Sequence, residues 1–268
     1  MLRRILFVLM SGSALWAQDP APSAPAALTK EEIATAVADE GISLPMPGEL
    51  FSALGKRGRI DWTALLRKTP SSTFTNRQQI AMNLGALVAD GYLAVEAQDK
   101  QAVKNIAKDI RAMAKGIGVQ DELVSRGNSI VQFAEAGQWD TLKEELEATQ
   151  NDVIAAMIAH KDQELVTLVM LGGWLRGTEV VSNYIAEHYA EESARVLRQP
   201  AVVDHFVQKL AIMPKRVVDT PFMNGVRLAL FDIKKAVTFG SEVVPTVEDV
   251  QKLSELAGGV MKLISTKD

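Results

Sequence analysis

The chain contains no proline between Pro70 and Pro200, a stretch that covers almost half of its 268 residues. Proline lacks a backbone N–H donor and is normally found in turns and at the first turn of helices. A stretch of this length without proline favours long helices joined by short turns that contain glycine, asparagine or aspartate. The sequence therefore predicts a helical core over this part of the chain.

Apolar residues recur at helical spacing through the proline-free stretch. Val103, Ile106, Ile110 and Met113 lie three or four residues apart, and lysines and arginines occupy the opposite face. This pattern indicates an amphipathic helix. Capping residues such as Asp99, together with glycines that end helices, set the limits between neighbouring helices. The same reasoning predicts helices over residues 75–98, 100–116, 121–136, 139–160 and 163–188.

Shorter helices are predicted on both sides of this stretch. Thr29 and Glu32 form a capping box, Asp61 is placed to cap a second short helix, and Thr246 is placed to cap the last one. The predicted ranges are 29–41, 49–55, 62–68, 190–198, 201–212, 222–238 and 247–264. No run of alternating apolar and polar residues predicts a strand.

We therefore expect an all-α fold of about ten helices, packed as a multi-helix bundle or as stacked helical hairpins. Two long apolar helices, 75–98 and 163–188, are expected at its centre. Residues 29–268 are interpreted as a single helical domain, and a subdomain boundary near residue 200 is left open.

The first residues predict export from the cytoplasm. Arg3 and Arg4 precede an apolar run, and cleavage is expected after Ala17, with Ala14 as the alternative. An uncleaved anchor is the other interpretation, but the apolar run is shorter than the ~20 residues of a membrane span. Residues 1–17 are thus predicted to be a signal peptide, and residues 18–28 a flexible Pro/Ala-rich leader. The mature protein is expected in the periplasm or secreted, with no stable membrane span.

Composition excludes several classes of function. The chain has no cysteine, which rules out disulfides, cysteine-ligated zinc and iron–sulfur clusters. Its net charge is −4, and loss of Arg3 and Arg4 makes it more negative, so no general attraction to nucleic acid is expected. The three histidines His160, His188 and His205 lack metal-binding spacing, and no nucleotide-binding motif is present. We expect no metal and no cofactor.

The two central helices carry glycines inside apolar segments. Glycine within a helix costs about 1 kcal/mol relative to alanine, so it usually has a packing reason. Gly173 and Gly177 are four residues apart in one helix, as are Gly85 and Ala89 in the other. Close packing of the two helices is the expected explanation. A ligand lying against bare backbone is the alternative.

Five polar residues on these helices are the candidate site. Asp90 lies among apolar neighbours in one helix, and Arg176 and Glu179 are similarly placed in the other. A buried charge is costly unless it is paired, so we expect Asp90 and Arg176 to be partners across the crossing. One interpretation is a structural ion pair. The other is a polar pocket that binds a small ligand, with Asn83 and Tyr92 as further lining residues.

No motif in the sequence identifies a reaction. The leading hypothesis is a non-catalytic binding or scaffolding protein of the bacterial envelope, with its partner unidentified and another envelope protein as the candidate. A small-molecule-binding protein with its pocket between the two central helices is the first alternative. A hydrolase or lyase that uses carboxylates such as Asp90 and Glu179 is the second, and it requires those groups to meet in an open cleft.

Overall fold

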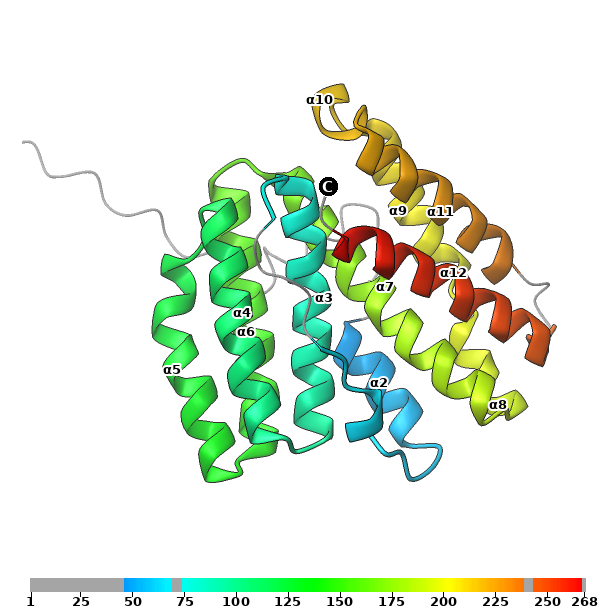
Figure 1. The fold of residues 1–268 in the computed structure, drawn as a ribbon, viewed down its shortest axis with the longest axis horizontal. Coiled ribbons are helices and arrows are strands. Elements are labelled where there is room, and N and C mark those ends of the chain that lie inside the picture. The colour runs from blue at the N-terminus through cyan, green and yellow to red at the C-terminus, as the bar shows by residue number, and fades with distance from the viewer. Residues whose placement is uncertain (1–45, 69–73, 239–242, 267–268) are drawn as a thin grey trace, which may run out of the picture.

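The computed structural model describes residues 46–68, 74–238 and 243–266. Within these residues every regular element is a helix and none is a strand, which confirms the all-α prediction. Figure 1 shows the helices packed into one arrangement. The predicted signal peptide, the leader and the helix 29–41 lie outside the described residues and stay predictions.

The proline-free stretch forms five long helices, each within two residues of its predicted limits. They are α3 (Arg77–Glu96), α4 (Lys100–Ile117), α5 (Asp121–Ala136), α6 (Trp139–Ala159) and α7 (Gln163–Glu187). The flanking elements are α2 (Pro47–Gly55), the 3-10 helix η1 (Thr63–Leu65), α8 (Glu191–Ala194), the 3-10 helix η2 (Arg195–Leu197), α9 (Pro200–Ile212), α10 (Lys215–Val218), α11 (Pro221–Val237) and α12 (Val247–Ser265).

Capping residues set the helix limits as the sequence predicts. The Asp99 carboxylate accepts a hydrogen bond from the Ala102 backbone N–H at 2.9 Å, at the start of α4. Thr246 and Asp249 form a reciprocal capping box at the start of α12. Gly118 ends α4 in the left-handed conformation, with φ of 83°, which glycine adopts without steric cost. Local chemistry therefore determines where these helices begin and end.

Short elements account for the corrections to the predicted fold. The helix predicted over 62–68 is only the single turn of η1, because the backbone becomes extended at Leu66 and the chain turns towards α3. The helix predicted over 190–198 is the short α8 followed by η2, and α10 was not predicted. These pieces are too short for hydrophobic periodicity to be read.

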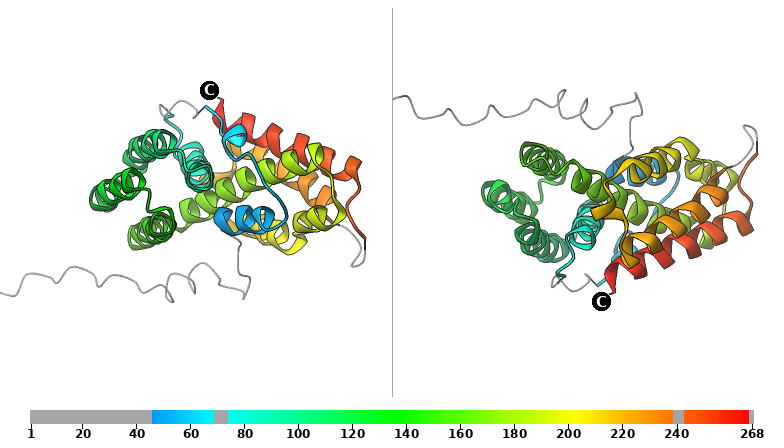
Figure 2. Two further views of the ribbon diagram at one scale, coloured as in Figure 1. Left: turned by 90° about the horizontal axis from the view of Figure 1, so that it is seen from below. Right: turned by 90° about the horizontal axis from the view of Figure 1, so that it is seen from above.

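The helices form two groups that meet at the centre. Helices α3 and α7 pack along each other, and α2 lies against both. On one side, α4, α5 and α6 join α3 in a ring of four helices, seen end-on in Figure 2. On the other side, α12 packs on α7, α11 on α12 and α9 on α11. Buried apolar side chains of both groups belong to one continuous core.

Glycines let α3 and α7 cross with their backbones in contact. A Cβ atom built on Gly85 would lie 1.8 Å from the carbonyl oxygen of Val169. A Cβ atom built on Gly172 would lie 2.0 Å from the carbonyl oxygen of Met82. Each glycine thus packs on the carbonyl three residues before the other glycine, so the contact is reciprocal. The predicted close packing of the central helices is present, and its two contact points are Gly85 and Gly172.

The predicted pair Gly173 and Gly177 lies against α2, and Gly173 also lies against α3. A Cβ atom on Gly177 would lie 2.9 Å from a methyl group of Leu50, and one on Gly173 would lie 3.3 Å from Pro47 Cγ and 3.3 Å from the Gly85 oxygen. Gly177 therefore faces α2, whereas Gly173 lies between α2 and the Gly85 backbone on α3. The spacing of small residues correctly indicates close packing, but Gly177 contacts a different helix from the one expected.

Helix α7 is long and apolar enough to cross a membrane if length and composition alone are considered. In the structure, 83% of its most apolar window is buried against other parts of the chain. Such burial is what a central core helix requires, because a helix that is apolar on all sides must be covered on all sides.

Candidate functional site

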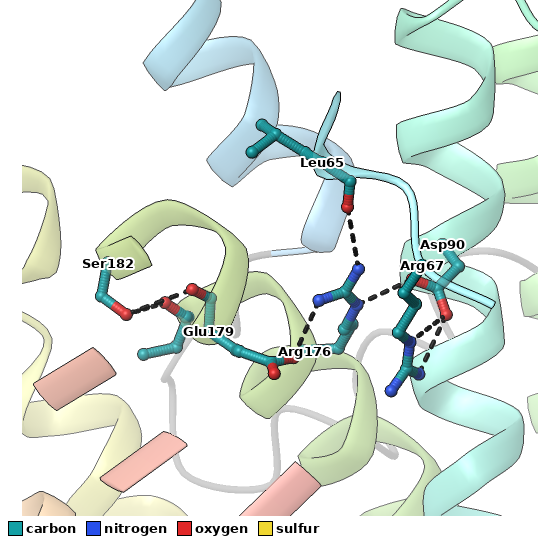
Figure 3. Close-up of polar contacts among 7 residues, drawn as sticks. Leu65, Arg67, Asp90, Arg176, Glu179 and Ser182 are labelled. Atoms are coloured by element: carbon teal, nitrogen blue, oxygen red, sulfur yellow. Dashed lines mark hydrogen bonds and ion pairs between the residues drawn. The ribbon is translucent and has the colours of Figure 1, made fainter. Parts of the chain in front are cut away.

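Asp90 and Arg176 meet just beyond the glycine crossing. Asp90 lies five residues after Gly85 on α3, and Arg176 lies four residues after Gly172 on α7. The Arg176 Nε atom donates to Asp90 Oδ1 at 2.7 Å, and both side chains are buried. Figure 3 shows the two side chains facing each other between the helices. The close approach of the backbones brings these charges into direct contact.

A second arginine completes the cluster from the segment that follows η1. Arg67 donates from Nε to Asp90 Oδ2 at 3.0 Å, and its Nη2 lies 2.9 Å from the same oxygen. The Leu65 carbonyl accepts a hydrogen bond from Arg176 Nη2 at 3.2 Å. These contacts attach the extended segment to both central helices (Figure 3). They also account for the extended backbone of this segment after Leu65.

Glu179 balances the charge of the cluster. Its Oε2 accepts from Arg176 Nη1 at 2.8 Å, so two arginines face two carboxylates. Burial by itself lowers the pKa of Arg176, but the charges of Asp90 and Glu179 outweigh burial and raise that pKa above its usual value. Arg176 therefore stays charged at every pH at which the protein is folded.

The cluster has the properties of a structural ion network. Both oxygens of Asp90 are held by guanidinium groups, and the side chain is only 3% exposed, so the carboxylate is not presented to solvent. Asp90 and Glu179 each bind Arg176 and do not meet in an open cleft. Among the described residues, no group of three or more His, Asp or Glu side chains is arranged to hold a metal ion. The geometry gives the hydrolase alternative no supporting observation.

Asn83 lies on the same helix but serves another contact. Its Nδ2 donates to the carbonyl oxygens of Gln79 and Ile264, and Gln79 itself donates to Ile264 and Thr266. These bonds satisfy carbonyl groups at the end of α12 that have no partner within their helix. Seven residues of helix separate Asn83 from Asp90, a rise of about 10 Å. Asn83 therefore anchors the C-terminal helix to the core.

Tyr92 points away from the cluster and packs on α2. A Cβ atom built on Gly48 would lie 2.8 Å from the Tyr92 ring, which shows how tightly the ring covers this glycine. Burial raises the pKa of Tyr92 above its usual value, and the charges of Glu147 and Glu49 add to the effect. The five candidate residues thus divide among three places, and only Asp90, Arg176 and Glu179 are brought together.

Sequence reasoning did not include Arg67 in the cluster. Arg67 follows a stretch rich in proline and glycine, and its partner Asp90 lies 23 residues later, on α3. Helical periodicity relates residues within one helix, so it carries no information about this contact. The only signal in the sequence is the balance of charges. Asp90 and Glu179 are two carboxylates, and Arg176 alone neutralises only one of them.

An exposed apolar groove between α9 and α11 was also missed by sequence reasoning. The groove has a volume of about 420 Å³ and is lined mainly by apolar side chains. Leu228 and Phe231 line it and are 70% and 53% exposed, and Ile212 at the end of α9 is 77% exposed. Scattered exposed apolar residues are normal, but several that gather around a groove mark a binding surface. In Figure 1 these helices lie at the outer edge of the molecule.

The groove has one charged lining residue, Arg227. Neighbouring charges are paired within the chain, Lys234 with Asp204 and Lys235 with Asp232. Lys235 also lies 4.5 Å from the centre of the Phe231 ring. Within the described part of the chain, Arg227 forms no ion pair with an aspartate or glutamate. The groove therefore offers apolar surface together with one available positive charge.

Comparisons with protein-family models, with curated proteins and with solved structures gave no match to this chain.

Proposed function

We propose that this chain is a non-catalytic binding protein that holds a helical segment of another polypeptide in the groove between α9 and α11. The observation that carries the proposal is the exposure of Leu228 and Phe231 on the walls of that groove. A folded chain normally removes such side chains from water, because exposing a large apolar side chain forfeits about 1.5–3 kcal/mol of burial. A partner that covers them recovers this free energy.

The groove favours an amphipathic helix with an acidic group. Two neighbouring helices form its walls, and an apolar helix face fits such a depression through side chains spaced three and four residues apart. Arg227 selects a carboxylate on the incoming helix, since a charge-assisted hydrogen bond is stronger than a neutral one. We therefore expect a short partner segment with apolar residues on one face and aspartate or glutamate beside them.

The size of the surface favours a separate partner over a second copy of the chain. Three large apolar side chains are exposed in this region, Ile212, Leu228 and Phe231. Even at about 200 Å² for each, they supply less than the roughly 800 Å² per partner of a stable interface. A short helix seated in the groove needs less area, and it is expected to bind weakly and reversibly.

A labelled peptide tests the proposal directly. The probe is a synthetic 18-residue amphipathic helix with leucines on one face and glutamates flanking them, and fluorescence anisotropy of the full chain with this probe gives the Kd. Leu228→Ser with Phe231→Ser is expected to weaken binding at least 10-fold. Val243→Ser is the matched control, because Val243 is exposed but lies outside the groove.

Reversing the charge of Arg227 distinguishes specific docking of the peptide from nonspecific hydrophobic adsorption. Arg227→Glu is expected to weaken binding of the acidic peptide and to strengthen binding of a version in which lysines replace the glutamates. Equal affinities for wild type and all groove variants would overturn the proposal. Sedimentation of the free protein supplies the other refutation, since a dimer that the same substitutions dissociate assigns the groove to a second copy.

Export from the cytoplasm belongs to the same proposal. It is supported by the charged and apolar pattern of residues 1–17, with Arg3 and Arg4 before the apolar run. Expression of the full chain in a Gram-negative host, followed by osmotic shock and mass measurement, tests it. A shortened chain in the periplasmic or medium fraction is expected, and a full-length chain confined to the cytoplasm refutes export.

A further inference from the structure

The ring formed by α3, α4, α5 and α6 encloses a cavity of about 40 Å³. Figure 2 shows the four helices end-on around this region. The cavity walls are almost entirely aliphatic, with Leu84, Ile106, Ile130 and Leu146 among the lining residues. A space of roughly 10–15 Å³ is enough for one water molecule, so this cavity has room for about three heavy atoms.

Small residues keep the cavity open. Gly91 on α3 and Ala107 on α4 line it, each where a larger side chain would occupy the space. A Cβ atom on Gly91 would meet only ordinary contacts, the nearest at 3.8 Å. The Arg111 guanidinium lies directly on Gly127, on the α4–α5 side of the cavity. The packing thus leaves a volume that neighbouring side chains do not fill.

One polar group in the cavity wall has no partner. Gln150 on α6 lines the cavity and is only 7% exposed. Its Nε2 lies 3.5 Å from the Met46 sulfur, whereas its Oε1 accepts no hydrogen bond from any described residue. The neighbouring Thr149 hydroxyl is already used, since it donates to the Glu145 carbonyl at 2.7 Å. A buried acceptor without a donor costs about 1–3 kcal/mol.

We propose that this cavity binds a small neutral aliphatic molecule that carries one hydroxyl group. The hydroxyl donates to Gln150 Oε1, and the aliphatic part packs against the branched side chains of the ring. The need for a donor follows from the orphaned acceptor, and the need for an aliphatic body follows from the walls. Arg111 is the one charged lining residue and lies against Gly127 on the α4–α5 side, and the other lining residues are uncharged, which favours a neutral ligand.

Two isomeric probes separate the hydrogen bond from simple cavity filling. Ethanol and its isomer dimethyl ether have the same atoms and only three heavy atoms each, but only the alcohol can donate. Titration of the full chain with each, followed by the methyl NMR signals of Leu, Ile and Val, gives both dissociation constants. The alcohol is expected to bind about 5–10-fold more tightly, the value of one neutral hydrogen bond.

Variants locate the site and keep the test decisive. Gln150→Met is expected to abolish the preference for the alcohol while leaving ether binding intact. Ala107→Leu is expected to fill the cavity and remove binding of both probes, whereas Ala112→Leu on the exposed side of α4 should leave both unchanged. Equal affinities of the two isomers for the unmodified protein, or a preference that survives Gln150→Met, would overturn the proposal. Absence of binding by either probe would do the same, and it would leave water as the partner of Gln150.

Discussion

Gly85→Ala is expected to destabilise the protein by forcing its two central helices apart. The new methyl group would lie 1.8 Å from the Val169 carbonyl oxygen, 2.7 Å from the carbonyl carbon and 2.8 Å from the Gly173 nitrogen. All three neighbours are backbone atoms of α7, so no side chain can rotate to make room. Ordinary carbon–oxygen contact requires about 3.3–3.6 Å, so the crossing must open by roughly 1.5 Å.

The expected cost is about 1–3 kcal/mol of the free energy of unfolding. Overpacking in a core costs about 1–3 kcal/mol, and alanine recovers up to about 1 kcal/mol through its higher helix propensity. Opening the crossing adds a further loss, because it lengthens the 2.7 Å bond between Asp90 and Arg176. For a chain of this size each kcal/mol lowers Tm by about 2–4 °C, which makes the shift easy to measure.

Urea unfolding followed by circular dichroism measures the effect, and Gly259→Ala is the matched control. Gly259 lies within α12 and is exposed, and a Cβ atom there would have no neighbour within 4 Å. Alanine at this position is therefore expected to stabilise by about 0.5–1 kcal/mol. Gly172→Ala is expected to resemble Gly85→Ala. The double variant should cost less than the sum, because one opening of the crossing accommodates both methyl groups. Unchanged stability of Gly85→Ala would refute the reciprocal glycine contact.

Three further perturbations test the network and the local structure. Asp90→Ala and Arg176→Ala are each expected to cost about 3–5 kcal/mol, and the double variant less than their sum, since each single change leaves a buried charge unpaired; a double-mutant cycle in urea measures this coupling. Burial raises the pKa of Tyr92, so the unfolded chain ionises first and stability falls as pH rises above about 10. Tyr92→Phe should remove that part of the alkaline loss, measured by unfolding at about pH 8 and pH 11. Thr246→Ala should cost about 1 kcal/mol through loss of the α12 cap, and an unchanged urea midpoint would contradict the assigned capping role.

Helices are predicted well from the sequence where residues at the ends of the helix itself determine its limits. Asp99 and Thr246 mark helix starts, and Gly137 marks a helix end, through interactions with residues no more than a few positions away. Helices this long also repeat their apolar pattern several times, which makes the period unambiguous. Short elements such as η1 and α10 have neither advantage. Their conformations depend on what they contact elsewhere, as Arg67 illustrates through its bond to Asp90.

Contacts between helices were predictable only in part. The Asp90–Arg176 partnership follows from the cost of burying either charge alone, and it needs no knowledge of orientation. The grouping of Asn83 with Asp90 fails because residues seven apart share a face but lie two turns apart along it. Tyr92 fails for the opposite reason, since a residue two positions from Asp90 points to a different side of the helix. Sequence spacing indicates the face of each residue but not the neighbour that covers it.

The cavity in the α3–α6 ring shows why such sites escape sequence reasoning. Gly91 and Ala107 are small residues that line the cavity, and each is an ordinary choice for its own helix. The empty volume arises only when the four helices pack together, beside the unpaired oxygen of Gln150. The cavity volume depends on how far along its axis each helix sits relative to its neighbours. The sequence of a single helix does not encode this relative position. A cavity built this way leaves no motif in the sequence.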